Sequence, residues 1–160
     1  MGTRSGDIDP AVLPFVMEKE NLTIDQVVNA LNKESGLYGV SGVSSDMRDI
    51  LKLVAEGDER GTTAFNLYIK RICDYIGSYF LYLNGVDAIV FTAGIGENSM
   101  PVRKAIVDRL GALGIQLNEE ANNVMGEEAL ISTADSKIKV YAIPTNEELM
   151  IAKDTYAFVK

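Results

Sequence analysis

The feature that most constrains the fold is a short apolar run that breaks into a glycine-rich turn. Residues 87–92 read Asp-Ala-Ile-Val-Phe-Thr, which is rich in strand-forming side chains and suited to burial on both faces. Gly94 and Gly96 follow, and glycine adopts backbone dihedrals closed to other residues while placing no Cβ between the main chain and a ligand. We therefore predict a central strand that ends in a turn able to approach a ligand closely.

A helix is predicted directly after this turn. Asn98 or Ser99 can cap it, Pro101 suits its first turn, and its apolar residues are Val102, Ala105, Ile106 and Leu110. Because the free N–H groups of a helix N-terminus attract anions, the turn is a candidate phosphate site. A plain strand-to-helix connection explains the spacing about equally well. Neither the P-loop nor the dinucleotide fingerprint matches, since the lysine and the third glycine are missing.

Helical and extended patterns alternate along the rest of the chain. Helices are predicted at 11–19, at about 24–31 after a Thr23 cap, at 46–55, at about 62–83, briefly after an Asn118 cap, and after Pro144, where Thr145 and Glu148 form a capping box. A glycine- and serine-rich connection is expected at 36–45, and further strands at 113–117 and 138–143. Without an internal repeat or linker, this alternation predicts a single α/β domain over residues 1–160.

Composition narrows the class of protein. With 160 residues, of which 47% are hydrophobic and 24% charged, the chain is expected to form one ordinary soluble domain. No run is long enough for a membrane span and no leader opens the chain, so a cytoplasmic protein with no membrane partner is expected. A net charge of −8 disfavours nucleic-acid binding, and the absence of histidine excludes imidazole catalysis by this chain.

Four segments resemble the C-terminal motifs of the acetate kinase family, in the family's order. They are Thr-Arg-Ser-Gly-Asp-Ile-Asp-Pro at 3–10, Ser-Asp-Met-Arg at 45–48, Phe-Thr-Ala-Gly-Ile-Gly-Glu-Asn-Ser at 91–99 and Pro-Thr-Asn-Glu-Glu-Leu at 144–149. The resemblance covers this whole chain but less than half of a complete acetate kinase. It implies an actin/Hsp70/sugar-kinase-like (ribonuclease H-like) α/β domain, a mixed sheet with helices on its faces. By that resemblance residues 1–160 are the C-terminal nucleotide-binding domain, and the N-terminal domain is absent.

The resemblance also implies which residues bind ATP. The family's ATP-binding loop matches Gly94, Ile95, Gly96, Glu97 and Asn98, whose glycines would let the backbone lie against the nucleotide. A second ATP-contacting segment matches Asp46, Met47 and Arg48. Spacing alone favours a different interpretation of that segment, as a helix start with the aspartate as cap, the methionine in the core and the arginine in solvent.

Two single residues carry the remaining family roles. Arg4 matches the catalytic arginine that binds the substrate carboxylate and stabilises the transferring phosphoryl group, although position alone suggests a solvated arginine. Asp7 and Asp9 are expected to form turns or to pair with Arg4. Glu147 matches the glutamate associated with Mg²⁺ (or Mn²⁺), and Glu148 is expected only to favour the positive end of the last helix.

The activity implied by the resemblance is reversible transfer of the γ-phosphoryl group of ATP to acetate, giving acetyl phosphate and ADP, in a homodimer. The family's N-terminal domain supplies a further arginine, an aspartate, a histidine and a phosphate-binding segment, so the isolated chain is expected to be inactive. Two alternatives remain at this point. Besides the C-terminal part of an acetate kinase, the chain could be a non-catalytic nucleotide-binding or dimerisation module, or a fragment of a propionate kinase.

Overall fold

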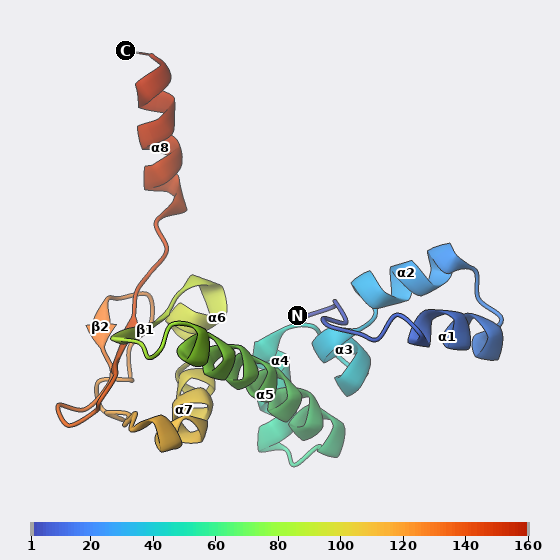
Figure 1. Cartoon of the computed structure of the whole chain (residues 1–160), viewed down its shortest axis with the longest axis horizontal. Coiled ribbons are helices and arrows are strands. Elements are labelled where there is room, and N and C mark those ends of the chain that lie inside the picture. The colour runs from blue at the N-terminus through green and yellow to red at the C-terminus, as the bar shows by residue number, and fades with distance from the viewer. Residues whose placement is uncertain (1, 160) are drawn as a thin grey trace. The chain divides into compact units, whose positions relative to one another are not determined.

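The computed structural model describes residues 2–159, which divide into two compact units, one up to Arg71 and one from Ile72. Each unit has a buried core of its own. The elements are α1 (Val12–Glu20), α2 (Ile24–Lys33), α3 (Gly36–Ser41), α4 (Met47–Ala55), α5 (Glu59–Tyr82), β1 (Ala88–Phe91), α6 (Ala93–Asn98), α7 (Met100–Arg109), the 3-10 helix η1 (Gly111–Leu113), β2 (Ala129–Leu130), β3 (Lys139–Ala142) and α8 (Glu147–Phe158) (Figure 1).

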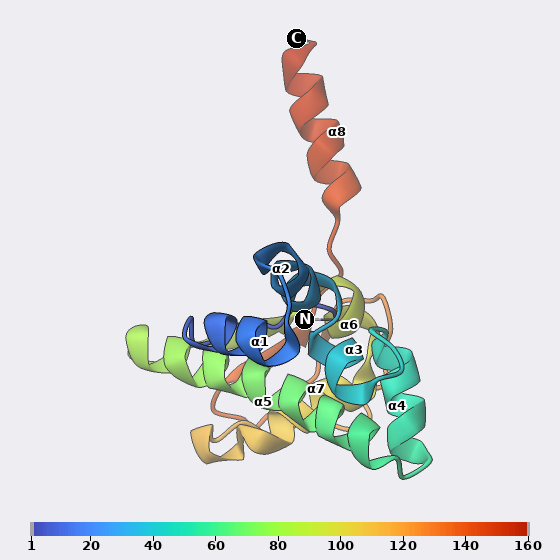
Figure 2. The ribbon, with the colours of Figure 1, turned by 90° about the vertical axis from the view of Figure 1, so that its right-hand side faces the viewer.

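The first unit is helical. Helices α1 and α2 lie side by side as a hairpin (Figure 2), joined through Asn21 in a left-handed conformation. The predicted Thr23 cap of α2 is confirmed, because its hydroxyl accepts a hydrogen bond from the Gln26 amide and the Gln26 side chain accepts one from the Thr23 amide. The core of this unit consists of Val27, Leu37, Met47, Ile50, Ala64 and Ile69.

The predicted connection at 36–45 is wrong over its first part, where the chain forms α3. Glycine and serine disfavour a helix, but tertiary contacts override that preference here. Leu37 and Ser41 are buried, and the guanidinium of Arg60 donates hydrogen bonds to the carbonyls of Val40 at 3.0 Å and Gly39 at 3.3 Å. These bonds satisfy carbonyl groups that a short helix leaves unpaired.

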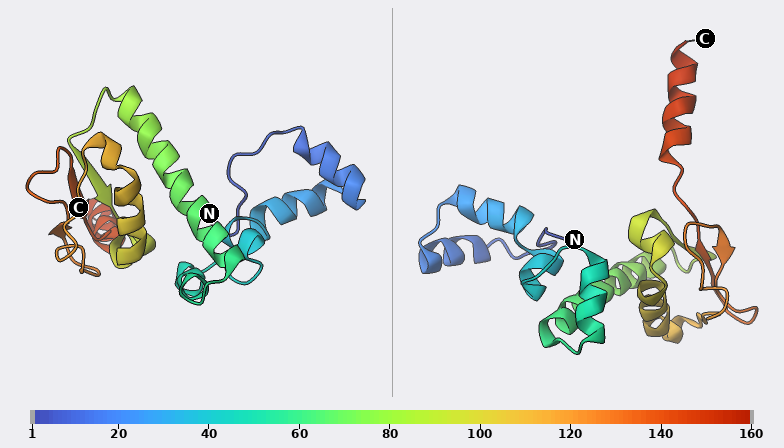
Figure 3. Two further views of the ribbon diagram at one scale, coloured as in Figure 1. Left: turned by 90° about the horizontal axis from the view of Figure 1, so that it is seen from below. Right: turned by 180° about the vertical axis from the view of Figure 1, so that it is seen from behind.

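The longest helix is α5, with 24 residues (Figure 3), and the prediction of a long helix at 62–83 is confirmed apart from an earlier start. The boundary between the two units falls within it. Among residues 2–159, no helix is both long enough and apolar enough to cross a membrane.

The second unit contains a mixed sheet in the order β1-β3-β2. Strand β1 pairs in parallel with β3, with Phe91 opposite Ala142, and β2 pairs antiparallel with β3. The expectation that 87–92 is a central strand buried on both faces is wrong, because within the described sheet β1 is an edge strand and only Phe91 in it is buried. The middle strand is β3, in which Val140 and Ala142 are fully buried. Strand order depends on pairing between distant segments, which a local pattern does not reveal.

The segment around the glycines also differs from its prediction. The glycine-rich turn is the short helix α6, in which neither glycine has a positive φ; the left-handed residue is Ala93, with φ of 58°. Ser99 lies at the predicted N-cap position of α7 but makes no capping hydrogen bond with its side chain, and the Asn98 side chain donates to the Gly94 carbonyl. Pro101 does lie in the first turn of α7.

Two predictions after α7 are wrong. The strand expected at 113–117 is replaced by η1 and a single bridge between Leu117 and Ser132, because the left-handed Gly114 ends η1 and turns the chain. Asn118 accepts a hydrogen bond from the Ala121 amide at 3.0 Å, but only a turn follows. Strand β2 was not predicted, since its two residues are too few to show an alternating pattern.

A buried guanidinium holds the second unit together. Arg103, on α7, is fully buried and donates hydrogen bonds of 2.7–2.9 Å to the carbonyls of Gly96, Glu97, Asn122 and Val124 and to the Asn122 side chain. Its charge is thereby solvated by fixed dipoles, which a buried ion requires. Arg103 therefore ties α6 to the irregular segment around Asn122.

Arg103→Met should destabilise the chain by at least about 3 kcal/mol, because four carbonyls and an amide side chain lose their donor at buried or partly buried positions. The control Arg48→Met makes the same change where the side chain is 85% exposed, so its effect on stability should be much smaller. Urea denaturation followed by circular dichroism measures both. Equal effects of the two substitutions would contradict a central role for Arg103.

Candidate functional site

The candidate site follows from the parallel pairing of β1 and β3. The carboxyl ends of parallel strands lie at the same edge of a sheet, and ligands in α/β proteins bind outside that edge. Phe91 and Ala142 are opposite one another, and the Ile143 amide continues the pairing by donating to the Phe91 carbonyl at 2.9 Å. The segments after the two strands, 92–98 and 143–147, therefore leave the sheet side by side.

A pocket of about 400 Å³ lies between these two segments. It is lined by Ala93, Gly94, Glu97, Thr145, Asn146, Glu147 and Glu148. The structure thus brings together three residues that the sequence singled out separately, Gly94 and Glu97 for ATP and Glu147 for the metal ion. Ile95, Gly96 and Asn98 belong to the same helix but do not line the pocket.

The two glycines of α6 have different surroundings. A Cβ added to Gly94 would meet no atom within 4 Å, so its backbone is open on the side of the pocket. A Cβ added to Gly96 would lie 3.1 Å from the carbonyl carbon of Phe91, which is tighter than ordinary van der Waals contact. Gly96 therefore lets α6 pack on the end of β1, whereas Gly94 leaves main chain accessible to a ligand.

Thr145 joins the two walls of the pocket. Its amide and hydroxyl both donate to the Glu97 carboxylate, at 2.5 and 2.8 Å. These hydrogen bonds lower the pKa of Glu97 below its ordinary value, and the bond from the amide has the larger effect. The predicted capping box at Thr145 and Glu148 is wrong for this reason; the cap of α8 is Asn146, which accepts from the Leu149 amide at 3.1 Å.

The pocket is acidic and rich in oxygen ligands. Its lining includes Glu97, Glu147 and Glu148 but no lysine or arginine. Carboxylate and amide oxygens suit Mg²⁺, which is usually held by one or two carboxylates together with waters and substrate phosphates. Among residues 2–159, no three acidic or cysteine side chains are grouped closely enough to hold a metal ion by themselves. Binding of a metal ion by Glu147 stays a prediction.

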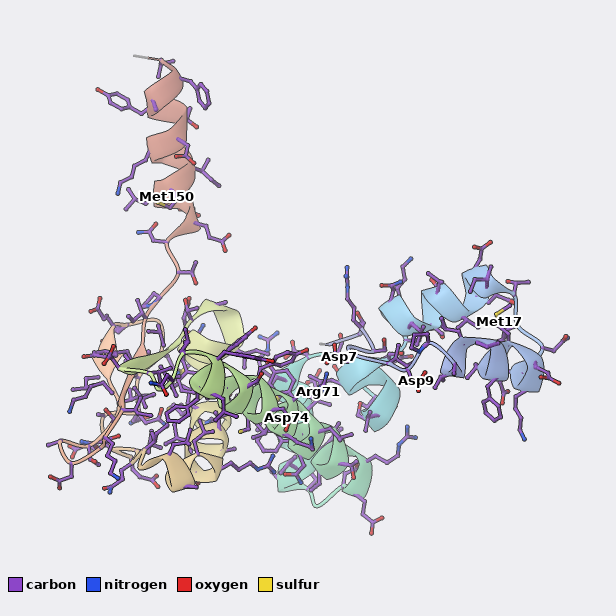
Figure 4. All side chains as sticks on the ribbon, viewed as in Figure 1. Asp7, Asp9, Met17, Arg71, Asp74 and Met150 are labelled. Atoms are coloured by element: carbon purple, nitrogen blue, oxygen red, sulfur yellow. The ribbon has the colours of Figure 1, made fainter. Side chains whose placement is uncertain are left out.

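Arg4 lies in the first unit, at a separate cavity of about 230 Å³. The cavity has an apolar lining that includes Leu37, Val40, Ala64 and Leu67. Asp7, also at this cavity, forms an ion pair with Arg71 (Figure 4), and Asp9 forms the expected turn by accepting from the Ala11 amide at 2.9 Å. Arg4 is exposed and lines the cavity, and its catalytic role stays a prediction.

The segment at 46–48 begins α4 in the way that its spacing favours. Asp46 caps the helix by accepting from the Arg48 amide at 2.8 Å, Met47 is buried, and the Arg48 side chain is in solvent, paired with Asp46. The pKa of Asp46 is lowered to about 2, and the main cause is its hydrogen bond from the Arg48 guanidinium. ATP contact by these three residues stays a prediction.

Sequence reasoning missed Arg103 and Thr145 as parts of the site. Arg103 had a signal, because it shares the helical face of Ile106, Val107 and Leu110, where an arginine must be paired if it is buried. No signal in the sequence marks Thr145, since its partner Glu97 lies 48 positions away.

The family model and the curated relatives that match this chain belong to the same family. The model of the Acetokinase family matches residues 1–153. An acetate kinase of Clostridium novyi is 58% identical over 160 residues, covering 100% of this chain and 40% of the relative. The chain thus spans about 40% of the length of the curated relatives that it matches.

Solved structures agree with this result. The crystal structure of Porphyromonas gingivalis acetate kinase has a TM-score of 0.92 and 45% identity, covering 100% of this chain and 40% of that one. A propionate kinase from Francisella tularensis has a TM-score of 0.87 and 39% identity, covering 95% and 38%. The predicted fold class, an actin-like α/β fold with a mixed sheet, is confirmed.

Gly96→Ala should lower the free energy of unfolding by about 1–3 kcal/mol, because the new methyl group is forced against the Phe91 backbone. The matched variant Gly94→Ala should leave stability unchanged or raise it slightly, since its methyl group meets open space. Thermal and urea unfolding of the two variants measure the difference. A Gly94→Ala variant less stable than Gly96→Ala would contradict this assignment.

Glu97→Gln should show a stability difference from the wild type that depends on pH. Because the pKa of Glu97 is lowered in the folded state, the ionised carboxylate stabilises the fold above its ordinary pKa of 4.5. That contribution should disappear as the pH falls through the folded-state pKa. Urea denaturation between about pH 3 and 7 measures it, with the exposed Glu20→Gln as baseline. A difference that grows toward acid would refute the role given to Thr145.

Proposed function

Because this chain belongs to the acetokinase family, we propose that it is the C-terminal part of an acetate kinase. The reaction of the complete enzyme is reversible transfer of the γ-phosphoryl group of ATP to acetate, which gives acetyl phosphate and ADP. The observation that carries this proposal is the pocket at the carboxyl ends of β1 and β3, where the glycine-rich helix faces the segment of Glu147. Residues 1–160 then correspond to the C-terminal nucleotide-binding domain.

The lining of this pocket supports binding of ATP together with a divalent cation. Polyphosphate alone would be repelled by the three carboxylates, whereas a complex with Mg²⁺ or Mn²⁺ presents positive charge to them. Glu147 would hold the metal ion, which neutralises charge on the phosphates when bound. The open backbone at Gly94 supplies a surface against which a nucleotide can lie without a side chain between them.

Charge stabilisation during transfer is assigned to Arg4. Its guanidinium stays protonated and offers a planar set of donors to carboxylate or phosphoryl oxygens, which suits a reaction carried mostly by positioning and charge neutralisation. In this proposal Asp46, Met47 and Arg48 add a second contact to ATP, for which the exposed Arg48 side chain is the available donor.

Finer points of the proposal rest on the relatives. Propionate is the alternative acceptor, because a propionate kinase is among the similar structures, and one methylene changes affinity by only about 1–3 kcal/mol. A homodimer in the cytoplasm, without a nucleic-acid or membrane partner, stays a prediction. A non-catalytic nucleotide-binding or dimerisation module is the competing proposal, since the chain spans about 40% of the length of the relatives that it matches.

A purified chain of residues 1–160 should produce little or no acetyl phosphate from ATP, Mg²⁺ and acetate, because this segment does not include the residues that the resemblance assigns to the family's N-terminal domain. It should still bind ATP in calorimetry, and a chelator should abolish that binding because the pocket is acidic. Robust acetyl phosphate formation that is lost on Arg4→Ala would contradict the expected inactivity. A dimer that binds no nucleotide by sedimentation and calorimetry would favour the assembly module instead.

A further inference from the structure

The hydroxyl of Thr145 is a junction between the two segments that line the pocket. It lies 2.8 Å from the Thr92 hydroxyl, 3.0 Å from the Ala93 amide and 2.8 Å from a Glu97 carboxylate oxygen. Thr92 follows β1, Ala93 and Glu97 belong to α6, and Thr145 follows β3. One side chain therefore connects the segment after β3 to both the end of β1 and α6.

The hydrogen bonds of this hydroxyl are complete. A threonine hydroxyl has one proton to donate and two lone pairs that accept. Its proton goes to the Glu97 carboxylate, which only accepts, and its lone pairs receive the Ala93 amide and the Thr92 hydroxyl. Ala93 has the left-handed φ of 58° that alanine rarely adopts, and the bond from its amide helps to hold that conformation.

Two consequences follow for a bound nucleotide. Glu97 lines the pocket, and Thr145 holds its carboxylate on the wall by two hydrogen bonds, which sets where this negative charge lies relative to a bound cation and its phosphates. Glu147 is two residues beyond Thr145, so fixing Thr145 also fixes where that side chain leaves the main chain.

We propose that Thr145 is a positioning residue of the nucleotide pocket, which anchors Glu97 and sets the distance between Gly94 and Glu147. This inference rests on the proposed function, because it assumes that the pocket binds ATP with a divalent cation. Thr145 itself does not contact the reacting groups. It affects nucleotide binding by holding together the two chain segments that line the pocket.

Thr145→Val and Thr145→Ser in the full chain test the proposal. Valine keeps the shape of threonine but removes the hydroxyl, so ATP affinity measured by calorimetry with Mg²⁺ should fall about tenfold. Serine keeps the hydroxyl and should bind ATP within about twofold of the wild type. Thermal unfolding of all three proteins, and hydrogen exchange at the Ala93 amide, show whether the junction itself has opened in the valine variant.

The binding measurements on these variants distinguish the role of Thr145 from the proposed function of the pocket. Weak binding by Thr145→Val with normal binding by Thr145→Ser, and both folded, supports the positioning role. Normal binding by Thr145→Val, or equal losses in both variants, overturns it while leaving the proposed function intact. A wild-type chain that binds no ATP with Mg²⁺ contradicts the proposed function first, and this role of Thr145 with it.

Discussion

The candidate site depends on the parallel register between β1 and β3. With Phe91 opposite Ala142, the chain leaves both strands at the same edge of the sheet, so two segments about 50 residues apart in the sequence line one pocket. A shift of this register by one residue would turn the buried side of each strand to solvent. The buried side chains of Phe91, Val140 and Ala142 therefore fix the position of the site as well as the core.

Two polar contacts then convert an edge of a sheet into a shaped pocket. The Arg103 guanidinium binds the carbonyls of Gly96 and Glu97 from within the core, and Thr145 binds the Glu97 side chain from the other strand. The first contact is made by a buried side chain and bears mainly on stability, whereas the second is exposed and also bears on the geometry that a ligand meets. Both contacts hold helix α6 in place.

Much of the fold was predictable because its signals are local. The Thr23 cap, the period of α5 and the cap at Asp46 are written in adjacent residues, and the family motifs placed Gly94, Glu97 and Glu147 among candidate site residues. The central position of β3 depends on its pairing with β1, where Ala88 lies opposite Lys139. The burial of Arg103 depends on Asn122, 19 positions away, and the bond from Thr145 on Glu97, 48 positions away. No periodicity contains that information, and so Thr145 was assigned to a capping box.

In the function proposed for this chain, the segments after β1 and β3 together bind ATP with a divalent cation. Titration of the isotope-labelled chain with ATP and Mg²⁺, followed by amide chemical shifts, tests this binding residue by residue. The largest changes are expected at 93–97 and 145–148, and they should be lost when a chelator is added. Changes confined to one of these segments, or changes that persist without the cation, would contradict it.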